Sequence, residues 1–218
     1  MTDAEQRLAA VQAGLNRACR DAARTEIPLL VAISKTFDAD AIRPLIAAGQ
    51  RHFGENRVQE AAEKWPEMLA ETPGITLHLV GQLQSNKAAD AVALFDVIHS
   101  VDRPSLVAAL AKAQTATGKH PACYLQVNIG DEDQKGGCAL ADLPALLEQA
   151  RSVGLNVVGL MCVPPANLEP APYFALLAEH AKRLGLAGLS MGMSSDYETA
   201  ALLGSTVVRV GSALFGSR

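Results

Sequence analysis

The alternation of short apolar segments with longer amphipathic ones restricts the fold of this chain more than any other feature. Eight short segments, most of them apolar, predict strands over residues 29–34, 51–54, 75–80, 95–99, 122–129, 155–162, 187–190 and 206–210. Helical patterns separate these strands over residues 39–48, 56–69, 84–94, 103–117, 140–151, 171–184 and 195–203. A further amphipathic helix over residues 2–22 precedes the first strand. The chain therefore contains eight consecutive β/α units.

Eight such units fit either a closed barrel or an open, doubly wound sheet. No G-x-G-x-x-G motif follows the first strand, so the dinucleotide-binding form of the open sheet has little support. Several strands, such as 29–33, 157–163 and 207–210, are apolar without alternation, which is typical of strands covered on both faces. We expect one α/β domain over residues 1–218: a (β/α)8 TIM barrel with an extra N-terminal helix and a short C-terminal helix. The strand at 51–54 is short and polar and gives the prediction its weakest support, with 187–190.

Composition fits this expectation and excludes several classes of function. The 218 residues suit one barrel, 49% of them are hydrophobic, and the formal net charge is −4, which argues against nucleic-acid binding. No apolar run approaches the ~20 residues that span a bilayer, and the N-terminus lacks the basic and apolar parts of a signal peptide. The four cysteines show no C-x-x-C spacing, which is typical of free thiols. We expect a cytoplasmic protein, and the acidic, charge-poor composition fits a monomer.

Lys35 is the sharpest candidate for chemistry, because it follows the first predicted strand. Functional groups of α/β barrels lie at the carboxyl ends of the strands. An amine in apolar surroundings or near other cations loses its proton more easily and then forms Schiff bases. The alternative is an ordinary surface lysine at a strand–loop junction, and spacing alone favours that alternative.

The end of the chain supplies the second half of a possible site. Gly211 and Ser212 follow the last strand, where barrels often bind phosphate on a short extra helix; equally, this segment could only close the barrel. Arg209 lies within the same apolar strand, and a buried arginine needs a partner. That partner is either a structural carboxylate or an aromatic nitrogen. An arginine facing a pyridine nitrogen keeps it unprotonated and makes the ring a weaker electron sink.

Two further polar positions are ambiguous because each lies beside a helix start. Ser195 and Glu198 fit a capping box, which leaves Ser194 free to face a ligand. Asn56 and Gln59 also fit a capping box, and that role could coexist with a ligand contact.

Other polar groups are more simply structural. The charged loop at 130–138 is interpreted as a mobile surface loop, with Lys135 as a less favoured second amine near the pocket. The five histidines show no metal-binding spacing, so no metal site is expected. His78 and His99 lie in apolar strands and are expected to be hydrogen-bonded core groups.

Five segments together resemble a known family: residues 31–36 (VAISKT), 53–56 (FGEN), 78–87 (HLVGQLQSNK), 189–194 (LSMGMS) and 208–216 (VRVGSALFG). The chain resembles the pyridoxal phosphate homeostasis proteins (the YggS/PROSC group) over nearly its whole length. That family is related to the barrel domain of alanine racemase, so the resemblance also implies a single barrel.

The resemblance implies a cofactor and a role for each candidate residue. Pyridoxal 5′-phosphate would form an internal aldimine with Lys35, while Arg209 would face its pyridine nitrogen. The phosphate would be held by Ser194, Gly211 and Ser212, and Asn56 would lie near the ring. Members are regarded as carriers or regulators of the free cofactor without established catalytic turnover, so no catalytic residue is expected. Apo forms of enzymes that use this cofactor are possible recipients.

Two catalytic alternatives accompany this expectation. A cofactor-dependent amino-acid racemase needs a base on each face of the substrate carbon. Lys35 could serve one face, but none of Tyr124, Tyr173 and Tyr197 lies at the carboxyl end of a predicted strand. The second domain through which alanine racemases supply the opposing base is also not expected here. A Schiff-base aldolase or lyase would instead use Lys35 without any cofactor.

Overall fold

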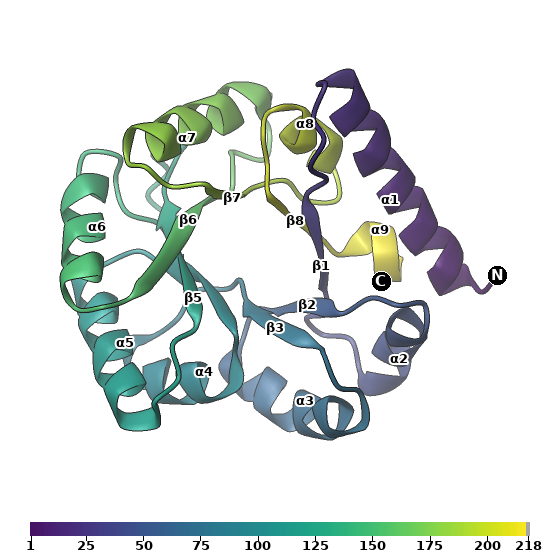
Figure 1. Cartoon of the computed structure of the whole chain (residues 1–218), viewed down its shortest axis with the longest axis horizontal. Helices are drawn as coiled ribbons and strands as arrows, with labels where there is room; N and C mark the ends of the chain where they lie inside the picture. The colour runs from purple at the N-terminus through teal and green to yellow at the C-terminus, as the bar shows by residue number, and fades with distance from the viewer. Residues whose placement is uncertain (217–218) are drawn as a thin grey trace.

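The strands close into a parallel barrel in chain order, as expected (Figure 1). The computed structural model describes residues 1–216; the expected domain, 1–218, also includes residues 217–218, which lie outside the described part. The strands are β1 (Leu29–Ile33), β2 (His52–Glu55), β3 (Thr76–Leu79), β4 (Val97–Val101), β5 (Ala122–Val127), β6 (Asn156–Cys162), β7 (Gly188–Ser190) and β8 (Val207–Val210). The barrel closes where β1 pairs with β8, with Leu29 opposite Val207 and Ala32 opposite Val210.

Helices surround the barrel and cover the outer face of its strands (Figure 1). They are α1 (Asp3–Asp21), α2 (Ala39–Ala47), α3 (Val58–Glu71), α4 (Ala88–Leu94), α5 (Pro104–Thr117), α6 (Leu143–Ser152), α7 (Ala171–Arg183), α8 (Tyr197–Leu202) and α9 (Ser212–Phe215), with a 3₁₀ helix, η1 (Ser85–Lys87), before α4. The last helix, α9, is too short to cover the seam between β8 and β1. Helix α1 packs against α2, α8 and α9 and buries Leu8, Val11 and Leu15 there. The N-terminal helix therefore completes the outer ring.

The polar strand β2 is a genuine strand because each of its polar side chains has partners. On one face His52 turns into the barrel and contacts His78 of β3, with 3.1 Å between Nδ1 and Nε2. On the other face Glu55 is fully buried against α3, where it accepts a hydrogen bond from Nε1 of Trp65. Tertiary contacts thus replace the apolar pattern that marks the other strands.

Both predicted capping boxes are wrong. Helix α8 begins at Tyr197 with Asp196 as its N-cap, and α3 begins at Val58 with Arg57 as its N-cap; neither N-cap side chain bonds the helix. The Asp196 carboxylate instead accepts a hydrogen bond from the backbone N–H of Met193, at 2.6 Å, and closes the turn after β7. Loop geometry therefore displaced both helix starts by one or two residues.

Among the described residues, no helix is long and apolar enough to cross a membrane. The same part of the chain contains no cluster of three or more histidine, cysteine, aspartate or glutamate side chains able to hold a metal ion. All four cysteines are free and buried.

Candidate functional site

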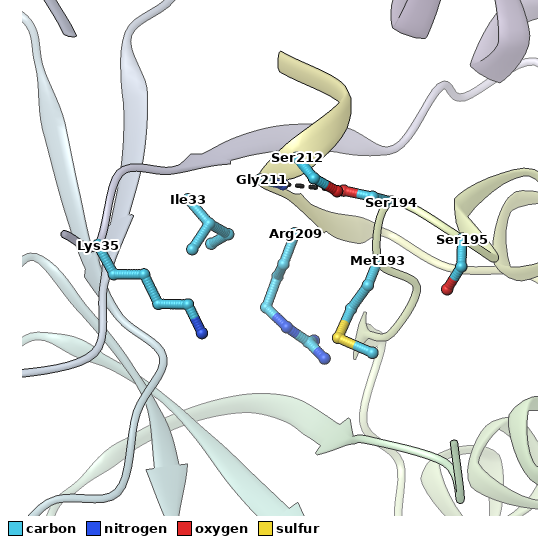
Figure 2. Close-up of a pocket in the computed structure, with 8 residues that line it drawn as sticks. All are labelled: Ile33, Lys35, Met193, Ser194, Ser195, Arg209, Gly211 and Ser212. Atoms are coloured by element: carbon cyan, nitrogen blue, oxygen red, sulfur yellow. Dashed lines mark hydrogen bonds between the residues drawn. The ribbon is translucent and has the colours of Figure 1, made fainter. Parts of the chain in front are cut away.

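A cavity of about 420 Å³ opens at the carboxyl ends of β1, β7 and β8. This volume lies within the usual range for small-molecule sites, roughly 300–1,000 Å³. Figure 2 shows the side chains of Lys35 and Arg209 entering the same space. Lys35 follows β1 and Arg209 lies in β8, the two paired strands that close the barrel. The lining residues are Ile33, Lys35, Met193, Ser194, Ser195, Arg209, Gly211 and Ser212.

Lys35 presents an amine to this cavity. It follows β1 directly, its side chain is half-buried, and its amine points toward the centre of the cavity (Figure 2). It takes part in none of the hydrogen bonds or ion pairs formed between the described residues, although Lys64 close by forms several. An amine without an internal partner is available to react with a bound molecule.

The backbone that carries Lys35 is held by a buried cation on α3. The amine of Lys64 lies 2.8 Å from Oε1 of Glu55 and donates to the carbonyl oxygens of Ser34 and Phe37, each at 2.9 Å. These two carbonyls flank Lys35 on either side. Ser34 is also tied to Glu55, because its hydroxyl donates to Oε1 at 2.7 Å. Lys64 therefore fixes the loop from which the Lys35 side chain extends.

Thr36 shows that this loop is under conformational constraint. Its φ angle is +66°, a left-handed conformation that β-branched residues rarely adopt. The backbone N–H of Thr36 donates to the Glu60 carboxylate, which also accepts from Lys64 at 3.2 Å. Burial raises the pKa of Glu60, but the hydrogen bonds from Thr36 and Lys64 outweigh it and lower the pKa. A charged Glu60 thus stabilises the strained turn after Lys35.

Arg209 is a buried cation without a carboxylate partner. Its side chain is 5% exposed, Nη1 donates to Oγ of Ser190 at 2.6 Å, and Nη2 donates to the carbonyl oxygen of Cys162 at 2.8 Å. No ion pair involving Arg209 is formed among residues 1–216, which removes the structural ion pair that the sequence left open. A guanidinium has five N–H donors, so some remain for a molecule in the cavity.

Ser194 and the turn after β8 form one polar wall of the cavity. Oγ of Ser194 accepts hydrogen bonds from the backbone N–H of Gly211, at 3.1 Å, and of Ala213, at 3.4 Å. These N–H groups are aimed at the position of a single oxygen atom. Ser195 also lines the cavity, but it is exposed and lies on the far side of Met193 and Ser194 from Lys35 (Figure 2). A ligand anion can exchange with the Ser194 hydroxyl at these donors.

Asn56 lies in a neighbouring cavity and not among the residues that line the one at Lys35. It follows β2 and lines a cavity of about 280 Å³ with Arg57, Gln82 and Lys87. The loop after β3 approaches its backbone closely, because a Cβ at Gly81 would lie 2.2 Å from the carbonyl oxygen of Asn56. The structure therefore brings five of the six predicted binding residues together and places Asn56 one loop away.

Lys135 is not a free second amine. It is held in the loop after β5, where its amine pairs with Glu132 at 2.6 Å and donates to the carbonyl oxygen of Pro164 at 2.8 Å. The predicted binding residues did not include Ile33 and Met193, which line the Lys35 cavity, or Lys64 and Glu55, which lie behind it. The sequence contains one signal for the ion pair between Glu55 and Lys64, namely a glutamate directly after the predicted strand at 51–54.

Comparisons with known proteins extend over the whole barrel. The profile of the alanine racemase N-terminal domain matches residues 7–218. The pyridoxal phosphate homeostasis protein of Pseudomonas aeruginosa is 40% identical over 100% of this chain and 97% of its own length. The protein of the same name from Escherichia coli is 37% identical over 100% of this chain and 98% of its own.

Solved structures give the same result. PipY of Synechococcus elongatus has been solved without and with pyridoxal phosphate bound. Its cofactor-free structure is 42% identical, with a TM-score of 0.87 and coverage of 97% of this chain and 99% of PipY. The structure with pyridoxal phosphate is 41% identical, with a TM-score of 0.85 and coverage of 98% and 100%. An alanine racemase from Clostridium difficile shares the fold alone, at 13% identity and a TM-score of 0.68 over 94% of this chain and 56% of its own.

Proposed function

Because the chain belongs to the family of pyridoxal phosphate homeostasis proteins, we propose that it binds pyridoxal 5′-phosphate and contributes to the balance of this cofactor in the cell. The observation that carries the proposal is the shared cavity of Lys35 and Arg209: an unpartnered amine and a buried, carboxylate-free guanidinium face one small-molecule space. An aldehyde that carries an anionic group fits such a pair of cations.

The residues present fit this cofactor at three of its polar groups: the aldehyde, the phosphate and the pyridine nitrogen. Lys35 would form the aldimine with its aldehyde. Ser194, Gly211 and Ser212 would hold the phosphate, since the N–H groups that now meet the Ser194 hydroxyl suit an anionic oxygen. Arg209 would face the pyridine nitrogen. When bound, the cofactor would supply an electrophilic carbon; Arg209 would limit its strength as an electron sink, because an arginine does not give up its proton.

Asn56 has the least support among the proposed binding residues. Its side chain borders the adjacent cavity with Gln82 and Lys87. We keep Asn56 as a residue near the ring for one reason. It follows Glu55, whose carboxylate accepts a hydrogen bond from Ser34, the residue before Lys35. A contact between Asn56 and the cofactor remains a prediction.

We further propose that the protein holds the cofactor without catalytic turnover. Racemisation needs a second base opposite Lys35. Of the residues that line the cavity, only Lys35 carries a basic amine, and none is a tyrosine, histidine, aspartate or glutamate. Tyr124 is buried in the barrel, where its ring stacks on His99 with 4.6 Å between centroids. These positions support a carrier over the alternative racemase.

Hand-over to apo-enzymes and action as a monomer in the cytoplasm complete the proposal. The four buried, free cysteines fit a reducing compartment. The cavity that Lys35 lines lies at the carboxyl ends of the strands, on the barrel rim, which suits release of the cofactor to another protein without unfolding.

A titration of the purified protein with pyridoxal phosphate tests the binding proposal. We expect a yellow absorption band that borohydride bleaches, that is lost in Lys35→Ala and that is retained in Lys112→Ala, which removes an exposed lysine from α5. A band that persists in Lys35→Ala would contradict the proposed attachment. Exchange of α-protons of L- and D-amino acids in heavy water tests turnover, and exchange faster than with free cofactor would favour the racemase.

A further inference from the structure

A chain of hydrogen-bonded side chains runs through the barrel interior from Arg209 to the opposite end of the barrel. Beyond Ser190, Nδ1 of His99 lies 2.8 Å from Oγ of Ser190, and Nε2 of His99 lies 2.9 Å from Nδ1 of His78. His78 in turn contacts His52 with 3.1 Å between Nε2 and Nδ1. His52, the first residue of β2, lines a second cavity of about 440 Å³ at the amino-terminal ends of β1 and β2.

The three imidazoles of this chain are uncharged at neutral pH. Burial, with a smaller contribution from the neighbouring His52, lowers the pKa of His78 to about 3. Burial, His78 and the Arg209 cation all lower the pKa of His99. Burial also lowers the pKa of His52, against the opposing effect of Asp96. A neutral imidazole donates from one nitrogen and accepts at the other, so the chain must run in one direction or the reverse.

Arg209 decides between the two directions. Its Nη1 donates to Oγ of Ser190, so the hydroxyl proton of Ser190 needs a separate acceptor. Ser190 is fully buried, and its Oγ has only Arg209 and His99 as partners among the described residues. The hydroxyl proton therefore goes to Nδ1 of His99, since a buried hydroxyl without an acceptor is costly. Each histidine then carries its proton on Nε2 and donates toward His52.

We propose that His99, His78 and His52 act as positioning residues for Arg209, and that protonation of His52 at the far end of the barrel reverses their hydrogen bonds and loosens the hold of Ser190 on Arg209. The behaviour proposed for the histidine chain does not require a bound cofactor. Its effect on the cofactor rests on the proposed function, in which Arg209 faces the pyridine nitrogen.

The proton balance of the reversal is one proton gained from solvent. A cationic His52 carries protons on both nitrogens, so its Nδ1 donates and needs a bare Nε2 on His78. The single protons of His78 and His99 then reside on Nδ1, and Nδ1–H of His99 donates to Ser190. Ser190 now receives donors from both His99 and Arg209, and its own proton loses its acceptor. The hydroxyl must rotate away, which weakens its contact with Nη1 of Arg209.

The surroundings of His52 permit this protonation at the half-buried end of the chain. From the neighbouring elements it faces the neutral His78 of β3 and the carboxylate of Asp96, which accepts from the backbone N–H of Leu77. Arg51 precedes it, with its guanidinium bonded to carbonyl oxygens of Ile46 and Gln50. The helix α1 side of the cavity contributes Gln12, Leu15 and Asn16, which are uncharged.

Nitrogen-15 spectra of histidine rings in the cofactor-free protein test the chain directly. At pH 7.5 we expect His52, His78 and His99 to carry their protons on Nε2. On lowering the pH, His52 should gain a second proton while His78 and His99 stay neutral and move theirs to Nδ1 with the same midpoint. The exposed His120 is the internal reference. Either of two results would overturn the proposal. One is protons on Nδ1 of these rings at pH 7.5, and the other is no change in the tautomers of His78 and His99 as His52 titrates.

His52→Gln is the matched variant, because its amide oxygen accepts from Nε2–H of His78 at any pH. We expect His78 and His99 to keep their protons on Nε2 throughout the titration. With pyridoxal phosphate bound, the absorption band of the unmodified protein should shift with the midpoint of His52, and the band of His52→Gln should not. If the cofactor binds but its absorption band does not shift as His52 titrates, the coupling is refuted and the proposed function stays intact. If the cofactor does not bind, the proposed function is refuted, and the ring spectra still test the hydrogen bonds of the histidine chain.

Discussion

Lys64 and Glu55 form an ion pair behind the loop that carries Lys35, with 2.8 Å between Nζ and Oε1. The carboxylate is fully buried, and the lysine side chain is 10% exposed. Oε2 of the same glutamate has no hydrogen-bond partner among the described residues, so the charge of Glu55 depends on contacts to Oε1 from Lys64, Ser34 and Trp65. Because Lys64 belongs to α3 and also binds the loop of Lys35, the ion pair both stabilises the fold and fixes the position of the reactive amine.

Lys64→Met is expected to destabilise the protein strongly, because it leaves the Glu55 charge buried without a cation. Removing one partner of a buried ion pair typically costs about 3–5 kcal/mol in the free energy of unfolding. Urea denaturation followed by circular dichroism measures the change. Lys112→Met on the exposed face of α5 is the control, with an expected change within about 0.5 kcal/mol. If Lys64→Met is as mild as the control, the ion pair does not hold the loop.

The double variant Glu55→Gln with Lys64→Met refines this test. A neutral amide in place of the carboxylate removes the uncompensated charge, so the double variant should lose less stability than Lys64→Met alone. Equal losses in the two proteins would show that Lys64 acts through its bonds to Ser34, Phe37 and Glu60 and not by compensating the charge of Glu55.

Ser194→Ala is expected to weaken binding of pyridoxal phosphate by roughly tenfold or more, because a hydrogen bond to a charged group contributes about 1.5–3 kcal/mol. Ser195→Ala provides a control at the adjacent position, which is exposed and lies farther from Lys35 than Ser194 does (Figure 2). Dissociation constants from absorption titrations of both variants give the comparison. Equal affinities would place the phosphate elsewhere on the barrel rim.

Acid is expected to destabilise the protein from about pH 6.5 downward through its buried histidines. The folded-state pKa of His78 is about 3 and that of His99 is also lowered, both below the unfolded value of about 6.5. Between these values the unfolded chain binds protons that the folded chain does not, so the free energy of unfolding falls as pH falls. Two such groups give a slope of roughly 2.7 kcal/mol per pH unit when the unfolded state is fully protonated.

Denaturant titrations between pH 6.5 and 5.5 measure this slope before most carboxylates titrate. His78→Leu should remove the contribution of one of the two histidines, about half a proton at pH 6.5 and about nine-tenths of a proton at pH 5.5. His120→Gln, at an exposed position, should leave the slope unchanged. An unmodified protein whose stability is flat over this range would show that these histidines are already protonated in the folded state.

The sequence contained enough information for the barrel because strand periodicity is local. The β1 segment is apolar along its whole length and β8 is apolar except at Arg209, and their pairing brings Val31 opposite Arg209. That register places Lys35 and the Gly211 turn on one rim, as the sequence predicted. The barrel was predictable because it consists of repeated β/α units, and each unit carries its own sequence pattern.

Features that depend on tertiary partners were not accessible in this way. The polarity of β2 made it the weakest predicted strand, yet His52 and Glu55 find partners on two other elements that no local pattern reveals. The capping box proposed for Ser195 failed because Asp196 closes the preceding turn. The close approach of Gly81 to the backbone of Asn56 was also not predicted, and the expected position of Asn56 near the ring stays a prediction.

Peptide mapping after borohydride reduction tests the central claim most directly. The protein is saturated with pyridoxal phosphate, reduced, digested and analysed by tandem mass spectrometry. We predict one dominant phosphopyridoxyl adduct, on the ε-amine of Lys35, with Lys64 and Lys135 unmodified because both amines are held in ion pairs. A dominant adduct on any other lysine, or none in a protein that retains the cofactor, would contradict the account.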